Sequence, residues 1–418
     1  MACEDFIGGD INADPNSPTS VPVSAQFPAI QIAMADVYGG DFSRICGLLI
    51  QQVEGTARQW SSFNQYSGLT PNRFDDAWQN IYENILNEIK VAKISATENG
   101  LNHHLAMMEI SEAFTLMIAT DVWDDIPYSD GLRGLQAISP AFDTQASIYE
   151  LIYARLESGI ALLSGNAGPD APGNEDVFYQ GSASNWIKAA YAIKARGLLH
   201  QGNYAEAKAA AELSFTNPVD NLAFQYPDAN AAGGWYRFNR DRTGDLEFHP
   251  QMRNLMTALG DTVRLAVYDQ IFNTDHTYFI PDFFSEMITY REMQFLIAEC
   301  AFKNGDRSEA RTAYINGITA SFDRVGADNL EVYLANQDVD PGSDNLTLAH
   351  IMTQKYIGLF VQPEVYSDYR RTNIPTLIPV FSRFIPVRWD YSSDEYAFNS
   401  NLIEGSVDIF RDRVGWNR

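Results

Sequence analysis

The chain has 418 residues, 45% of them hydrophobic, so it is long enough and apolar enough to bury a large core. Its net charge of −25 argues against nucleic-acid binding, because contacts with phosphate depend on Lys and Arg. No apolar run approaches the ~18 residues needed to span a membrane. The six histidines form no ligand-like cluster, so we expect neither a metal nor another cofactor.

The first 23 residues are predicted to be an N-terminal segment and spacer. Cys3 follows a small residue and precedes two acids, which resembles the mature start of a bacterial lipoprotein, whose cysteine carries lipid. An unmodified terminal cysteine is the alternative. Residues 10–22 are rich in Asn, Asp, Pro and Ser and are expected to be extended. Cys46 and Cys300 lie on apolar helical faces and are predicted to be buried thiols.

The next part of the chain has helical periodicity, because apolar residues recur every three or four positions. This pattern predicts helices at residues 25–38, 42–54, 74–94, 101–123 and 147–163. Gly39, Gly40 and Asp41 are predicted to end the first helix and cap the second. The acidic stretch 121–130 is predicted to end the fourth.

Two segments, 190–217 and 288–324, share the layout of a tetratricopeptide repeat. Each is predicted to be a pair of helices joined by a tight turn, at Gly202 in the first and at Gly305 in the second. In both, an alanine stands seven positions before the glycine and another stands five positions after it. A repeat needs neighbours to bury its open face, so two copies support each other. Two unrelated alanine-rich hairpins are the alternative.

Two regions predicted to be irregular, 58–72 and 216–286, hold aromatic residues in polar surroundings. The candidate ligand-binding residues are Trp60, Phe63, Tyr66, Trp235, Tyr236 and Tyr278, with Asn64, Gln65, Asn239 and Arg240 as polar neighbours. Aromatic rings beside polar groups suit carbohydrate and peptide surfaces. These rings could equally well pack against helix ends or in the core.

The C-terminal part is predicted to hold short helices at 329–335, 347–361 and 364–371, followed by a mostly irregular tail. The tail, 372–418, is rich in proline and aromatic residues. Arg370 and Arg371 are expected to be structural, because guanidinium groups pair with carboxylates or helix C-termini and can hold the tail on the scaffold.

Several short stretches together resemble one protein family. They are the Cys3 start, the spacer 12–18, the break 125–129, the stretches 292–299, 314–318 and 354–356, and the tail stretches 368–375 and 384–399. This set is similar to the SusD-like (SusD/RagB) outer-membrane nutrient-binding lipoproteins over nearly the whole chain.

The resemblance implies a mainly α fold, with a tetratricopeptide-like helical-hairpin scaffold and a loop-rich, irregular insert and tail. It implies a lipoprotein N-terminal segment, 1–23, and a single SusD-like domain, 24–418. The scaffold would occupy about 24–215 and 287–371, the ligand-facing insert about 216–286, and the tail 372–418.

The resemblance further implies a non-enzymatic protein, lipid-anchored through Cys3 in the outer membrane and facing the cell exterior. Such a protein binds a glycan or oligosaccharide and works with a SusC-like TonB-dependent transporter. Two other classes remain open: an oligopeptide-binding SusD-like protein, and an all-helical glycoside hydrolase, which would need two carboxylates facing each other in a cleft. Replacing Trp60 or Trp235 with Ala is expected to weaken ligand binding with little effect on the melting temperature.

Overall fold

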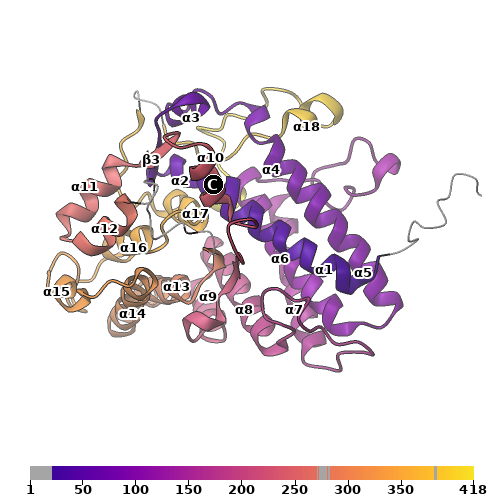
Figure 1. Ribbon diagram of the computed structural model, residues 1–418, viewed down its shortest axis with the longest axis horizontal. Helices are drawn as coiled ribbons and strands as arrows, with labels where there is room; N and C mark the ends of the chain where they lie inside the picture. The colour runs from indigo at the N-terminus through magenta and orange to yellow at the C-terminus, as the bar shows by residue number, and fades with distance from the viewer. Residues whose placement is uncertain (1–20, 271, 273–279, 281–282, 381–383) are drawn as a thin grey trace, which may run out of the picture.

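The computed structural model describes residues 21–270, 272, 280, 283–380 and 384–418 (Figure 1). Cys3 and Tyr278 lie outside these residues. The described residues are mainly helical, as predicted. Among them, no helix combines the length and the apolar character needed to cross a membrane.

The N-terminal half consists of long helices, drawn in indigo and purple in Figure 1. They are α1 (Val23–Val37), the π-helical η1 (Tyr38–Phe42), α2 (Ser43–Leu49), α4 (Asp75–Gln79), the π-helical η3 (Asn80–Asn87), α5 (Glu88–Glu98), α6 (Asn102–Trp123) and α7 (Gln145–Leu163), with a short 3₁₀ turn, η4 (Gly134–Gln136). α6 is buried along nearly its whole length, because α1, α5, α7 and α8 (Ala183–His200) pack around it. The helices predicted at 74–94, 101–123 and 147–163 are confirmed.

The break predicted at Gly39–Asp41 is wrong, because α1, η1 and α2 follow one another as one helical run. The two glycines serve close packing instead of termination. A Cβ on Gly39 would lie 2.1 Å from the Ser285 Oγ, and a Cβ on Gly234 would lie 3.0 Å from the Gly40 Cα. Segments far apart in sequence therefore approach this run closely.

Both predicted hairpins are present. The first joins α8 to α9 (Tyr204–Glu212) through Gly202 at φ +76°, and the second joins α13 (Tyr290–Lys303) to α14 (Arg307–Val325) through Gly305 at φ +89°. These left-handed angles favour glycine. In the second hairpin, four alanines between the two helices, Ala298, Ala301, Ala310 and Ala313, are buried. α9 packs against α13, so the two hairpins are neighbours, and α6 and α7 form a further packed pair.

The insert 216–286 is more ordered than predicted. It holds η5 (Pro218–Asp220), β2 (Leu222–Gln225), α10 (Gly234–Asp241), β3 (Leu246–Phe248), α11 (Pro250–Ala258), α12 (Thr262–Asp269) and the start of β4 (Phe284–Ile288). β2 pairs with β4 at the base of the insert, and β3 pairs with β1 (Val53–Gly55) from the N-terminal half, both antiparallel. Residues 53 and 54, predicted to end a helix, therefore belong to a strand.

The C-terminal part holds short helices and a tail that crosses the scaffold. The helices are α15 (Leu330–Leu334), α16 (Leu348–Gly358), α17 (Glu364–Thr372), α18 (Ser393–Phe398) and the 3₁₀ turn η7 (Gly415–Asn417). Arg370 donates hydrogen bonds to the Asp121 carbonyl at 2.6 Å and to the Val387 carbonyl at 3.3 Å. Arg371 pairs with Glu299 at 2.8 Å. The structural role predicted for both arginines is confirmed.

A buried ionic network connects the hairpins to α6 and α17. Arg196 of α8 pairs with Glu292 of α13 at 2.7 Å and with Glu364 of α17 at 3.3 Å. His200, one turn further along α8, lies 2.8 Å from Glu364 and 3.2 Å from Asp121. Each of these side chains is almost fully buried, so every charge in the network depends on its partner.

Burial opposes the charged form of His200, but the carboxylates of Glu364 and Asp121 outweigh it and raise the pKa of His200 to about 9. The pKa of His200 in the folded state exceeds its unfolded value of about 6.5. Protonated His200 therefore contributes its full stabilisation of the folded state below pH 6.5, and this contribution is lost as pH rises through 9. The free energy of unfolding is expected to fall by about 3 kcal/mol between pH 6.5 and pH 9.5, which urea unfolding at the two pH values measures. A His200→Gln variant should lack this loss, and an equal loss in both proteins would contradict the assignment.

Candidate functional site

The region predicted to be a loop at 58–72 contains α3 (Arg58–Asn64) and the 3₁₀ turn η2 (Pro71–Arg73). Trp60 and Tyr66 are buried, whereas Phe63 is half-buried. The Tyr66 hydroxyl donates a hydrogen bond of 3.4 Å to the Leu49 carbonyl at the end of α2. Tyr66 therefore fills a helix end, which was the alternative interpretation of this aromatic group.

The aromatic residues predicted on the insert lie on α10. Trp235 is buried, and its Nε1 donates a hydrogen bond of 2.8 Å to the Ser43 Oγ of α2. Tyr236 is half-buried. Phe238, one turn after Trp235, is also half-buried and packs against the core.

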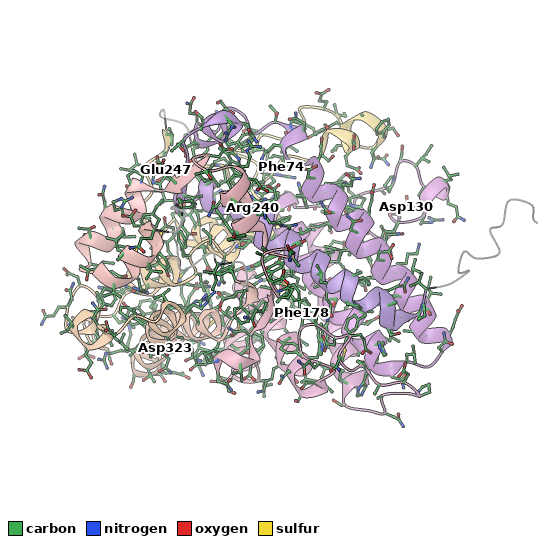
Figure 2. All side chains as sticks on the ribbon, in the orientation of Figure 1. Phe74, Asp130, Phe178, Arg240, Glu247 and Asp323 are labelled. Atoms are coloured by element: carbon green, nitrogen blue, oxygen red, sulfur yellow. The ribbon has the colours of Figure 1, made fainter. Side chains whose placement is uncertain are left out.

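The two aromatic groups meet. The Trp60 ring lies 5.4 Å from the Phe63 ring and 5.3 Å from the Phe238 ring, centroid to centroid, and both pairs are edge-to-face. Such pairs are stabilised beyond the area that they bury. A buried indole therefore supports two partly exposed rings that come from α3 and α10. Figure 2 shows the side chains on the ribbon and labels Phe74, just before α4, and Arg240 on α10.

Two arginines and one carboxylate lie beneath these rings. Arg73 donates two hydrogen bonds, of 2.7 and 3.0 Å, to Asp41, and Arg44 lies 3.5 Å from the same carboxylate. The Arg73 guanidinium carbon lies 5.0 Å from the Phe63 centroid, and that of Arg44 lies 4.9 Å from the Phe238 centroid. Both distances suit cation–π attraction. Asp41, in the π-helical η1, thus positions one cation behind each ring.

An open cavity of about 470 Å³ lies over this cluster. Trp60, Phe63 and Phe238 supply its rings, and its polar side chains include Gln59, Ser62, Thr70 and Asn72. Its volume lies within the range of about 300–1,000 Å³ that ligand pockets occupy. We call this space the aromatic cavity. It offers ring surfaces and hydrogen-bonding groups together, which are the two contacts that a sugar ring accepts.

Comparison with known families identifies the chain. The model of a SusD-like family, described as "Starch-binding associating with outer membrane", matches residues 15–280 and 272–392. The chain belongs to the SusD-like family. A search of curated proteins finds no match to this SusD-like protein.

Solved structures share the fold. A SusD/RagB family protein from Bacteroides thetaiotaomicron is 21% identical, with a TM-score of 0.77 over 95% of this SusD-like chain and 99% of its own. A chitin-binding SusD homologue from Flavobacterium johnsoniae is 20% identical, with a TM-score of 0.77 over 95% and 98%. A SusD homologue from Bacteroides fragilis is 18% identical, with a TM-score of 0.76 over 96% and 100%.

Part of the cluster in this SusD-like protein was not predicted. Phe238 was not a candidate, although its three-residue spacing from Trp235 would place both on one face of a helix. Asp41, Arg44 and Arg73 come from three different elements, and no sequence motif connects them. Of the predicted polar neighbours, none lines the aromatic cavity. The burial of Trp60 and Trp235 also changes the expectation for their replacement, because removal of a buried indole lowers stability.

Proposed function

We propose that this SusD-like protein binds a glycan in the aromatic cavity and serves nutrient uptake at the outer membrane. The observation that carries the proposal is that Phe63 and Phe238, both packed against Trp60, line one open cavity together with polar side chains. The family description, which names starch and the outer membrane, and a structural neighbour described as chitin-binding support the same ligand class.

In this proposal the rings contact the C–H faces of the sugar, and the polar side chains bind its hydroxyl groups. Phe63 and Phe238 provide the ring surfaces. Gln59 and Asn72 each carry an amide with two donors and an acceptor, which suits hydroxyl groups. Trp60 and Trp235 are buried, so their role is to support the contacting rings.

The ionised state of Asp41 favours binding over hydrolysis. A glycosidase needs one carboxylic acid that is protonated near neutral pH and a second carboxylate opposite it. Burial raises the pKa of Asp41, but Arg73 and Arg44 outweigh this effect and hold it below its usual value. Asp41 therefore stays ionised and bound to two guanidinium groups, which suits a positioning role.

The proposal extends to location and partner. We infer that Cys3 carries a lipid that holds the protein on the outer membrane, facing outward, and that the protein delivers its glycan to a SusC-like TonB-dependent transporter. The lipoprotein-like context of Cys3 and the outer-membrane association in the family description support this inference.

Phe63→Ala and Phe238→Ala test the site. Burial of a phenylalanine ring contributes about 1.5–3 kcal/mol, so each variant is expected to weaken binding about tenfold or more. Isothermal titration calorimetry with starch and chitin oligosaccharides measures this change. Phe398→Ala is the matched control, because Phe398 is 76% exposed on α18 and does not line the aromatic cavity. Unchanged affinity in both test variants would remove the cavity as the binding site.

A further inference from the structure

A second open space adjoins the aromatic cavity. It has a volume of about 890 Å³ and runs between α1 and the α4–η3–α5 run. Asp41, Arg44 and Asp76 line both spaces, so the two are continuous at these side chains. We call this second space the α1 groove. Alone, it is already within the size range of about 300–1,000 Å³ for a ligand pocket.

The α1 groove is bounded by two rows of residues at four-residue spacing. The α1 wall carries three small side chains, Ala25, Ala29 and Ala33, among larger ones such as Gln26 and Ile30. The opposite wall carries a row of polar side chains, Asp76, Asn80, Asn84 and Glu88, with Ala77 beside them. Alanine leaves the space open, and the polar row follows it for about 18 Å at the helical rise per residue. The polar row starts at Asp76, beside the aromatic cavity, and leads away from it.

The polar row keeps free hydrogen-bonding capacity. The Asn84 Nδ2 donates to the Asn80 Oδ1 at 2.7 Å, and the Asn80 Nδ2 donates to the Asp76 carbonyl at 2.7 Å. Each amide retains a second N–H and further lone pairs. Within the described part of the chain, the Asp76 and Glu88 carboxylates accept no hydrogen bond. The row can therefore bind several hydroxyl or amide groups in succession.

The local charge restricts what the α1 groove accepts. Asp36, Asp76 and Glu88 contribute carboxylates to its lining, and its cation, Arg44, is held by Asp41. An acidic sugar would place like charges close together, which is unfavourable. Uncharged and amino-bearing sugars meet no such repulsion. The two π-helical segments, η1 and η3, both contribute to this lining, and such segments occur frequently at functional sites.

We propose that the α1 groove continues the glycan site, so that the ligand is an extended oligosaccharide without acidic groups. One part of the chain contacts the rings of Phe63 and Phe238. The following units pass Asp41 and Arg44 and lie along the polar row of η3 and α5. This inference rests on the proposed function and adds the length and the charge class of the ligand.

Calorimetry with maltose and chitin oligosaccharides of two to seven units tests the length. Affinity for the series that binds is expected to rise at least tenfold from the shortest to the longest member. Ala29→Trp fills the α1 groove and is expected to abolish this rise while leaving the shortest oligosaccharide unaffected. Ala29 is exposed, so the fold should tolerate the ring. Ala161→Trp, at an exposed position on α7 that lines neither space, is the matched control.

Asn84→Leu gives a second test without added bulk, because Asn84 is exposed and its replacement removes only polar contacts. It is expected to weaken binding of long oligosaccharides alone. Affinity independent of length, or a length dependence that survives both variants, would overturn the inference and leave the aromatic cavity as the whole site. Oligogalacturonate bound as tightly as a neutral chain would overturn the charge class. If no neutral oligosaccharide binds the unaltered protein, the proposed function itself fails.

Discussion

Replacing Arg196 with Ala is expected to lower the free energy of unfolding by about 3–5 kcal/mol, because it leaves buried carboxylates without a partner. The Arg196 side chain is 1% exposed and donates two hydrogen bonds of 2.7 Å to Glu292 and one of 2.7 Å to the Met287 carbonyl. It also lies 3.3 Å from Glu364. One side chain thus connects both hairpins and α17. Urea unfolding followed by circular dichroism measures the loss.

Lys194→Ala is the matched control on the same helix. Lys194 pairs at 3.1 Å with Glu157, whose side chain is exposed, and surface pairs contribute roughly 0–1 kcal/mol. A double variant, Arg196→Met with Glu292→Met, should recover part of the lost stability, because it removes a buried charge of each sign together. If Arg196→Ala and Lys194→Ala lowered the free energy of unfolding equally, the buried pair would contribute no more to stability than the surface pair.

Trp60→Ala is expected to affect both folding and binding. Removal of a buried tryptophan costs about 3–5 kcal/mol, and Trp60 is 3% exposed. The same change removes the support of Phe63 and Phe238 and leaves Arg73 without an indole 5.2 Å away. The melting temperature and the affinity for oligosaccharides measured by calorimetry should therefore both fall. The sequence alone predicts a nearly constant melting temperature.

Trp60→Phe separates the two effects. A phenyl ring keeps an aromatic surface under Phe63 and Phe238, so this variant should retain more stability and more affinity than Trp60→Ala. Phe63→Ala completes the comparison, because it removes a half-buried ring and should mainly weaken binding. If Trp60→Ala binds oligosaccharides normally once folded, the indole does not support the site.

The hairpins could be predicted because their signals are local. Each hairpin has a glycine in the left-handed region, Gly202 in the first and Gly305 in the second. The alanines at helical spacing lie within about thirty residues of that glycine. The insert was harder, because α10, α11 and α12 are short and Pro250 starts α11 at a position where proline is favoured. Proline is more often a sign of a turn or loop, so its presence here favours the irregular structure predicted for 216–286.

Errors elsewhere come from contacts between distant parts of the chain. Gly39 and Gly40 have the local pattern of a helix end, yet Ser285 lies so close to Gly39 that a larger residue would require a shift, and Gly234 packs against the backbone of Gly40. The sequence predicts both segments that contribute aromatic rings to the site, 58–72 and 216–286. It does not tell which ring of each segment faces inward. Trp60 is buried where Phe238 of α10 packs against it, whereas Phe63 is partly exposed, and that packing is tertiary.

The paired strands at the base and middle of the insert have an evolutionary consequence. Their ladders consist of backbone hydrogen bonds between β2 and β4 and between β1 and β3, which depend little on side-chain identity. The residues between these ladders can therefore diverge while their attachment persists. A scaffold of this kind can accept local substitutions in the insert without rebuilding the hydrophobic interior that makes the molecule fold.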